Sequence, residues 1–240
     1  MSYLILVRHG QSTWNYENRF TGWVDVDLTT QGIQEAKLSG ELIKKLNINF
    51  ELAFSSIQIR SKKTLEIILD ILNKKNIKIN EAWELNERNY GDLSGKNKDE
   101  IEKKYGKEQM KIWRRSWDVS PPPLSKDSSY HPLNINIYKN IPRDKILDSE
   151  SLKNTYDRVI SYYQKNIEPL IQDKKNVLIS AHGNSLRALC KKLFNISNEK
   201  IIEFEIPTGN PLLINFEENF KIVDYKYLNK QRAKKIFRNL

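Results

Sequence analysis

Two of the three histidines in the chain stand in the same local context. His9 follows the apolar run "LILV" within R-H-G, and His182 follows "VLIS" within A-H-G. The glycine after each histidine lets the backbone approach a ligand closely. Imidazole serves as a nucleophile, a proton carrier or a metal ligand near neutral pH. A site shared by these two side chains would therefore carry chemistry, whereas His131, beside Pro132 in a proline-rich segment, is interpreted as structural.

The neighbours of the two histidines favour an anion over a metal ion. Arg8 precedes His9, while Asn184 and Arg187 follow His182. Zinc and manganese sites recruit further histidine, cysteine or carboxylate ligands, and arginine would repel a cation. Arginine grips phosphate through two parallel hydrogen bonds. Phosphate is therefore the expected ligand, and no metal is expected.

Two other residues are candidates for the same site. Arg60 lies in "SSIQIRSKKT", after a predicted strand and two hydroxyl residues, at the start of a predicted helix. Free backbone amides at a helix N-terminus favour an anion, which makes Arg60 a candidate phosphate ligand. Glu87, in "ELNERNYG", is a candidate general acid or base. Taken singly, each of these residues could equally be an ordinary solvated side chain.

Composition restricts the class of protein without naming it. The chain has 240 residues, 39% of them hydrophobic and 10% aromatic, which suits one large soluble domain over residues 1–240. Its apolar runs are too short to cross a bilayer or to form a secretory signal. The single cysteine, Cys190, excludes an intrachain disulfide and favours the reducing cytoplasm. The formal charge of +10 admits nucleic acid, an anionic membrane or small polyanionic substrates, although the basic residues are scattered along the chain.

The elements that must position these residues alternate between strand and helix. Apolar runs predict strands at 2–7, 51–56, 176–181 and 211–216, and residues 77–85 predict a strand followed by an extension. Five helices are predicted between and after these strands. The first begins after Thr29 or Thr30 and has Ile33, Ala36, Gly40 and Ile43 on one face. The others are predicted along Leu65 to Leu72, over the polar region 98–116, from Leu152 to Ile167 with Pro169 near the end, and from near Asn184. This alternation predicts an α/β fold with a mostly parallel central sheet and helices on both faces. Ligands bind at the carboxyl ends of strands in such sheets, so both histidines are expected at one edge.

Two segments interrupt this pattern. Prolines, serines and asparagines between about 117 and 148 forbid long regular elements, so a long loop insert is predicted there. A basic tail starts at about 222, and its stretch from 225 is compatible with a helix. Three roles for the tail stay open: a surface extension, a flap or an oligomer contact.

Longer motifs resemble the histidine phosphatase superfamily and, within it, the cofactor-dependent phosphoglycerate mutases. "LVRHGQSTWN" and "ENRFTGWVDVDLTTQG" are followed in the order of that family by "LNERNYGDLSGKNK", "WRRSWDVSPPPL", "ESLKNT", "AHGNSLRAL" and "IPTGNPL". R-H-G alone would indicate only the superfamily. "WRRSWDVSPPPL" and "IPTGNPL" are more specific to the mutases, and the blocks together cover residues 3 to about 215.

The resemblance implies a role for each matching residue. His9 would be the nucleophile that carries a phosphoryl group, clamped by Arg8, Arg60 and His182. Glu87 would exchange a proton with the substrate hydroxyl. The residues implied to bind the rest of the substrate are Ser12, Asn15, Thr21, Gly22, Arg88, Asn89, Tyr90, Lys98, Arg114, Arg115, Gly183 and Asn184.

The function implied is metal-independent interconversion of 3-phosphoglycerate and 2-phosphoglycerate in glycolysis and gluconeogenesis. The priming cofactor would be 2,3-bisphosphoglycerate, and the enzyme would be a cytoplasmic homodimer or homotetramer with no nucleic-acid or membrane partner. Two alternatives remain open from the residues. One is a phosphatase on the same scaffold, with water as the acceptor. The other is an inactive, basic nucleic-acid-binding module.

Two positions depart from the pattern of the family. Asn89 stands where a histidine is usual, and asparagine cannot take up a proton, so the tuning of Glu87 is expected to differ. Lys96 stands where an apolar residue is usual and is expected to add a charge near the pocket mouth.

Overall fold

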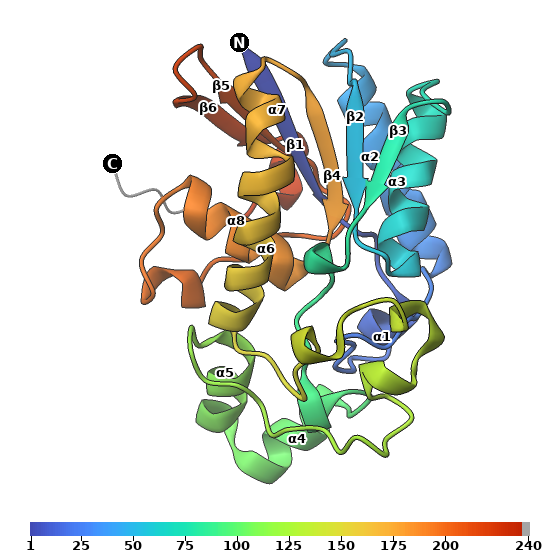
Figure 1. Ribbon diagram of the computed structural model, residues 1–240, viewed down its shortest axis with the longest axis vertical. Coiled ribbons are helices and arrows are strands. Elements are labelled where there is room, and N and C mark those ends of the chain that lie inside the picture. The colour runs from blue at the N-terminus through green and yellow to red at the C-terminus, as the bar shows by residue number, and fades with distance from the viewer. Residues whose placement is uncertain (237–240) are drawn as a thin grey trace.

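A single six-stranded sheet forms the centre of the molecule (Figure 1). The computed structural model describes residues 1–236. The strands are β1 (Ser2–Arg8), β2 (Leu52–Ser55), β3 (Lys78–Glu81), β4 (Val177–Ala181), β5 (Leu212–Phe216) and β6 (Ile222–Tyr227), in the order β3-β2-β4-β1-β5-β6. The pairs β3–β2, β2–β4 and β4–β1 are parallel, whereas β5 is antiparallel to both β1 and β6. The mostly parallel α/β sheet predicted from the sequence is confirmed.

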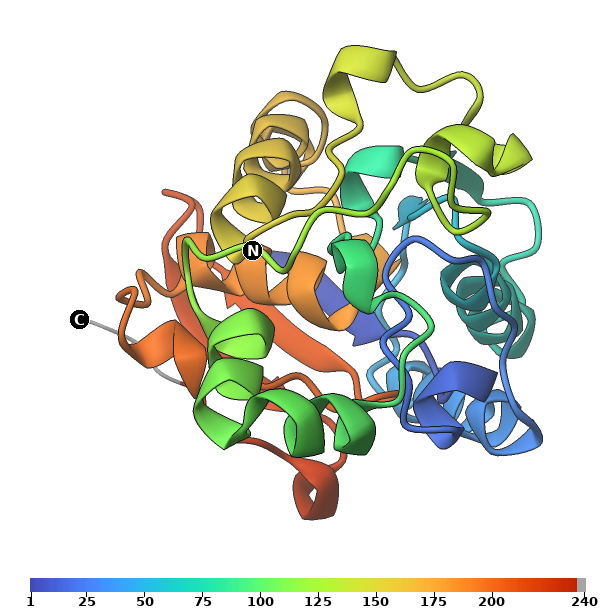
Figure 2. The same ribbon diagram turned by 90° about the horizontal axis from the view of Figure 1, so that it is seen from below.

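Helices cover both faces of the sheet, as the views in Figures 1 and 2 show. They are α1 (Thr13–Tyr16), α2 (Thr30–Lys44), α3 (Ile59–Ile71), α4 (Lys98–Tyr105), α5 (Lys107–Arg115), α6 (Leu152–Asn166), α7 (Glu168–Gln172) and α8 (Gly183–Leu193). α2 and α3 pack on one face, and α6, α7 and α8 pack on the other. Within residues 1–236, no helix is both long and apolar enough to span a bilayer.

Helices cover both faces of the sheet because its central strands are apolar on both faces. Successive side chains of a strand point to opposite faces. In β1, Leu4 and Leu6 join the core beneath α6 and α8, whereas Ile5 and Val7 join the core beneath α2 and α3. All four side chains are completely buried. An uninterrupted run such as "LILV" therefore indicates a central strand with helices on either side.

Local signals place the helix ends close to their predicted positions. Thr29 caps α2, its hydroxyl accepting a hydrogen bond of 3.0 Å from the Gly32 amide.

The helices differ from the prediction in three details. Ile33, which the pattern assigned to the buried face of α2, is 37% exposed. The polar helical region 98–116 divides at Gly106, whose positive φ of 84° ends α4. Pro169 lies in the first turn of α7, so it begins a helix there.

The segment near 117–148 is a loop, as predicted, and it packs against the rest of the fold. Its regular structure consists of three single 3₁₀ turns, Pro132–Asn134, Asn136–Tyr138 and Arg143–Lys145. Tyr138 is 1% exposed, and its ring lies against that of Trp23 with a centroid separation of 4.9 Å. Its hydroxyl accepts a hydrogen bond of 2.9 Å from Gln58 and donates to the Trp23 carbonyl. The loop, α4 and α5 lie together beyond the carboxyl ends of the parallel strands (Figure 1).

The helical conformation considered for the C-terminal stretch from 225 is wrong for residues 225–227. Residues 225–227 belong to β6, which pairs with β5 and extends the sheet, and one 3₁₀ turn follows at Lys230–Arg232. Pairing with β5 explains this outcome: the strand is anchored by its buried end residues Ile222 and Tyr227, while Val223 and Asp224 between them are exposed. Residues 237–240 of the predicted tail lie outside the described residues.

Candidate active site

The register of two neighbouring strands brings the two predicted histidines together. β1 and β4 are parallel, with Arg8 directly opposite Ala181. His9 and His182 are the next residues of these strands, so both leave the sheet at the same edge. Their ring centroids are 4.9 Å apart, and neither side chain is more than 2% exposed. The expectation that both lie at one edge of the sheet is confirmed.

The hydrogen bond at Nδ1 determines the tautomer of His9. Nδ1 lies 2.6 Å from the Gly10 carbonyl oxygen. Because a carbonyl can only accept, Nδ1 must carry the proton, which leaves the lone pair on Nε2. Burial lowers the pKa of His9 well below its usual value, and the charges of Arg60 and Arg8 lower it further. His9 is therefore a neutral imidazole with a free nucleophilic nitrogen at neutral pH.

His182 lies beside His9 and is not on the wall of the cavity itself. Its Nε2 pairs with the Ser56 hydroxyl at 2.7 Å, and its buried Nδ1 has no partner among residues 1–236. Burial lowers the pKa of His182 well below the usual value, followed by the charges of Arg60 and His9. When the Ser56 hydroxyl donates to Nε2, the proton sits on Nδ1 and is available to an anion.

Arg8 and Arg60 are buried cations with unused hydrogen-bonding capacity. Arg8 Nη1 donates to the Ile206 carbonyl at 2.9 Å, and Arg60 donates to the carbonyls of Val24 and Gly22 at 3.0 and 2.9 Å. The Nε–H groups of both arginines are buried, with no partner in the described chain. Burial lowers the pKa of each guanidinium from its ordinary value. Because a buried donor without a partner is costly, these groups fit an anion bound at His9.

Glu87 is held at both its carboxylate and its backbone. Its Oε1 accepts hydrogen bonds from the amides of Arg88 and Asn184, at 2.7 and 3.1 Å. Its own amide donates to Gln58 at 2.9 Å, and its carbonyl accepts from Arg158 at 2.9 Å. With 8% exposure, the carboxylate reaches the cavity but cannot turn freely. It is positioned for proton transfer within that cavity.

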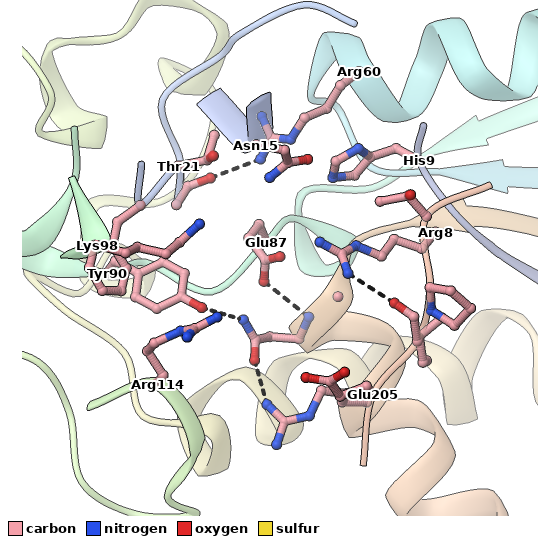
Figure 3. Close-up of a pocket in the computed structure, with 18 of the residues that line it drawn as sticks. Arg8, His9, Asn15, Thr21, Arg60, Glu87, Tyr90, Lys98, Arg114 and Glu205 are labelled. Atoms are coloured by element: carbon pink, nitrogen blue, oxygen red, sulfur yellow. Dashed lines mark hydrogen bonds between the residues drawn. The ribbon is translucent and has the colours of Figure 1, made fainter. Parts of the chain in front are cut away.

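These residues surround one cavity of about 510 Å³ (Figure 3). Thirteen of the predicted site residues line it: Arg8, His9, Asn15, Thr21, Gly22, Arg60, Glu87, Tyr90, Lys98, Arg114, Arg115, Gly183 and Asn184. They come from the end of β1 and the residue that follows it, from α1, from the starts of α3, α4 and α8, from the end of α5 and from two loops. Burial acts to raise the pKa of Tyr90, but nearby Arg88 and Arg114 lower it to about 8. The cavity is thus dominated by positive charge and donor groups.

Three predicted binding residues lie outside the cavity wall, and two of them contact residues that form it. Ser12 is fully buried and caps α1, its hydroxyl accepting from the Asn15 amide at 3.3 Å. Arg88 donates to the carbonyls of Trp113 and Arg114, at 2.9 and 3.0 Å, and so holds the last turn of α5. Neither of these two side chains lines the cavity, and Asn89 does not line it either.

The side chain of Asn89 is occupied elsewhere. Its Nδ2 donates to the Leu147 carbonyl at 2.8 Å, and its Oδ1 accepts from the Gly91 amide at 3.0 Å. Asn89 therefore ties the loop insert to the segment that carries Glu87. Lys96 pairs with Asp92 at 2.5 Å and is also absent from the cavity wall.

The sequence assigns no binding role to several residues of the wall, among them Arg187, which it marks only as a cation near His182. Arg19, Phe20, Arg187, Glu205, Ile206, Pro207, Thr208, Arg232 and Lys234 line the cavity. "IPTGNPL" was a signal for three of them, because it was recognised as a motif although no role was given to its residues. Arg187 is fixed by Asn184 at 2.7 Å, and burial, followed by the charges of Arg115 and Arg88, lowers its pKa to about 9. Within residues 1–236, no cluster of three or more histidine, cysteine or carboxylate side chains could hold a metal ion.

A close contact between two glycines sets the position of the loop that follows His9. A Cβ added to Gly10 would lie 2.1 Å from the Gly32 carbonyl oxygen, and one added to Gly32 would lie 2.1 Å from that of Gln11. A Gly32→Ala variant is expected to lose roughly 1–3 kcal/mol of unfolding free energy, because backbone must move to admit the methyl group. Urea unfolding checks this, with exposed Gln34→Ala as the control within the same helix. Equal midpoints for Gly32→Ala and the wild type would contradict the contact.

The two buried histidines make stability depend on pH in a known direction. Both pKa values are lower in the folded chain than in the unfolded chain, so the unfolded chain binds protons first as the pH falls. The unfolding free energy should thus be highest above pH about 6.5 and decline below it, by up to about 1.4 kcal/mol per pH unit for each histidine. Urea titrations at pH 7.5, 6.5 and 5.5 measure the slope. A His9→Asn variant should show a smaller slope, and an unchanged slope would refute the contribution of His9.

Comparisons with known proteins agree with this geometry. The profile of the histidine phosphatase superfamily (branch 1) matches residues 4–226. The 2,3-bisphosphoglycerate-dependent phosphoglycerate mutase of Pelagibacter ubique is 54% identical over 234 residues, covering 98% of both chains. The enzyme of the same name from Maricaulis maris is 49% identical over 235 residues, covering 98% of this chain and 97% of that one.

Solved structures share the fold at lower identity. A mycobacterial glucosyl-3-phosphoglycerate phosphatase in complex with VO₃ superposes with a TM-score of 0.69 at 18% identity, covering 95% of this chain and 97% of that one. A phosphoglycerate mutase from Bacillus anthracis gives a TM-score of 0.65 at 21% identity, with 94% and 91% covered. With the profile match over most of its length and relatives near 50% identity, the chain belongs to branch 1 of the histidine phosphatase superfamily.

Proposed function

We propose that this protein is a phosphoglycerate mutase that interconverts 3-phosphoglycerate and 2-phosphoglycerate through a phosphohistidine at His9. The state of the His9 ring carries the proposal. Nδ1 is bonded to Gly10, so the unprotonated Nε2 can attack phosphorus, and the pKa of the ring is well below neutrality. Relatives that are named 2,3-bisphosphoglycerate-dependent phosphoglycerate mutases, one of them 54% identical, support the substrate.

The residues around His9 fit a bound phosphoryl group. The free Nε–H groups of Arg8 and Arg60 are buried donors without partners in the described chain. Phosphoryl transfer depends on positioning and on neutralising the charge of the equatorial oxygens. 2,3-Bisphosphoglycerate supplies the priming phosphoryl group, which these arginines and His182 would hold. Arg114, Arg115 and Lys98 would receive the second anionic group of the substrate.

Two in-line transfers complete the reaction. In the first, Glu87 takes the proton from the C2 hydroxyl of 3-phosphoglycerate as that oxygen attacks the phosphorus on His9. The N–P bond breaks, and its electron pair returns to Nε2. In the second, Nε2 attacks the phosphorus on C3, and Glu87 returns its proton to the departing C3 oxygen. His9 is again phosphorylated and Glu87 is again a carboxylate, so protons and phosphoryl groups balance over the cycle.

The test is to incubate the purified protein with 2,3-bisphosphoglycerate and search for phosphohistidine by mass spectrometry. One phosphoryl group on His9 and mutase turnover that survives EDTA are expected. Loss of turnover with the chelator would overturn the metal-free mechanism. Rapid net release of phosphate from 3-phosphoglycerate would favour the phosphatase, and salt-sensitive retention of duplex DNA without turnover would favour the binding module.

We further propose that the enzyme acts in glycolysis and gluconeogenesis in the cytoplasm, as a homodimer or homotetramer. Cys190, the single cysteine, is buried as a free thiol, which is compatible with a reducing compartment. Sedimentation analysis of the purified protein would determine the oligomeric state.

A further inference from the structure

We propose that Glu205 is a specificity-determining residue that weakens the hold of the pocket on a second phosphate relative to the phosphate bound at His9. The inference rests on the proposed function, since it concerns the ligands of the same cavity. Nine basic side chains line that cavity, and Glu205 and Glu87 are its two carboxylates within the described chain. Glu87 has an assigned role in proton transfer, whereas Glu205 has none.

The contacts of Glu205 place its charge among groups that a substrate needs. It forms an ion pair with Arg115 at the end of α5, and Lys234 lies 4.0 Å from its other carboxylate oxygen. Burial acts to raise the pKa of Glu205, but Arg115 outweighs it and keeps the pKa below the ordinary value. Glu205 is therefore ionised at neutral pH, and it pairs with Arg115, a cation that an incoming anion would otherwise bind.

The backbone beside Glu205 connects this ion pair to the phosphoryl site. Ile206, the next residue, accepts a hydrogen bond of 2.9 Å from Arg8 Nη1, and the Glu205 carbonyl accepts one of 3.3 Å from the Tyr227 hydroxyl. Figure 3 shows the Glu205 carboxylate across the pocket from Arg60 and Thr21. Its charge thus faces the end of the cavity away from Arg60, where the second anionic group of the substrate would bind.

The charge of the ligand decides how strongly Glu205 opposes it. A phosphate carries up to about two negative charges near neutral pH and a carboxylate adds one. 3-Phosphoglycerate therefore carries about three and 2,3-bisphosphoglycerate about five. A ligand with two phosphates places one near Glu205 when the other lies at His9, so it suffers greater repulsion than a single inorganic phosphate, which can bind at His9 alone. The phosphate of 3-phosphoglycerate takes the same end of the cavity while His9 carries a phosphoryl group, so it is repelled as well. Glu205 would thereby set how readily the bisphosphorylated intermediate escapes before the second transfer.

Replacing Glu205 by glutamine separates this role from a structural one. The substitution keeps the size of the side chain while removing its charge and releasing Arg115. The concentration of 2,3-bisphosphoglycerate that half-maximally phosphorylates His9 should fall about fivefold. KM for 3-phosphoglycerate should fall as well, because its phosphate binds near position 205 while His9 is phosphorylated. The matched control is Glu203→Gln, which makes the same charge change two residues away at an exposed position outside the cavity. It should alter neither value appreciably.

The competing outcomes are distinct. If Glu205 served to place Arg115 for the substrate, KM for 3-phosphoglycerate would rise in Glu205→Gln, and that result would overturn the proposal. A fall of the same size in the half-maximal 2,3-bisphosphoglycerate concentration for Glu203→Gln would also overturn it. Calorimetric titration with inorganic phosphate and with inorganic pyrophosphate repeats the comparison without turnover. If Glu205→Gln increases the affinity for pyrophosphate more than the affinity for phosphate, the role of Glu205 is supported even if the protein is not a mutase. Equal changes in the two affinities refute it.

Discussion

A His9→Asn variant is expected to lose at least about 10⁴-fold in mutase turnover, the scale seen when a covalent nucleophile is removed from an enzyme. Asparagine can keep a hydrogen bond near the Gly10 carbonyl, but it offers no nucleophilic nitrogen at the position of Nε2. Both transfers pass through that nitrogen, so neither can proceed. Steady-state assays of 3-phosphoglycerate conversion, together with mass spectrometry after exposure to 2,3-bisphosphoglycerate, measure the effect.

The matched control removes a histidine outside the cavity. His131 is fully buried and bonded to Asp148 at 3.1 Å, so His131→Asn tests the loss of a buried imidazole alone. It should retain the phosphohistidine and turnover, although its stability can fall. A phosphorylated His9→Asn protein, or one with near wild-type turnover, would show that another residue is the phosphoryl carrier.

A Glu87→Gln variant is expected to lower kcat by roughly 10²- to 10⁴-fold, the usual contribution of a positioned acid or base. Glutamine can still accept the two amide hydrogen bonds that Oε1 receives, so the local fold should persist. It cannot exchange a proton with the substrate hydroxyl, and both transfers therefore slow. KM should change little because the basic residues that hold the substrate are untouched.

Rapid-quench measurement of His9 phosphorylation, combined with steady-state kinetics, checks the effect at Glu87. Glu84→Gln is the control, because Glu84 lies three residues away and outside the cavity wall. It should leave kcat near the wild-type value. Unimpaired kcat in Glu87→Gln would exclude Glu87 as the proton carrier and direct attention to other titratable groups of the wall, such as Tyr90.

Much of the site could be predicted from the sequence because its central residues follow strands that are themselves easy to recognise. "LILV" and "VLIS" are buried on both faces, and such strands lie in the middle of a parallel sheet. The residues after them must then emerge at the same edge, which places His9 near His182. The resemblance supplied Glu87 and the arginines of α5, whose neighbours in the chain carry no such geometric signal.

Other parts of the site depend on contacts between distant segments. Asn89 was expected to affect Glu87, yet its amide group is taken up by Leu147 of the loop insert and by Gly91. Nothing near position 89 in the sequence predicts a partner 58 residues away. The C-terminal residues Arg232 and Lys234 reach the cavity because β6 pairs with β5 and turns the chain back toward the carboxyl edge of the sheet.

The α/β alternation, the pairing of the two histidines and the preference for an anionic ligand can be predicted from the sequence alone. These features rest on local periodicity and on residue types, which act over a few positions of the chain. The tertiary structure decided which nitrogen of His9 is free, which arginine donors stay unpaired and where Glu205 directs its charge. Those outcomes depend on burial and on partners up to 198 residues apart, such as Arg8 and Ile206. Hydrogen bonds and desolvation act through space, so only the assembled fold specifies them.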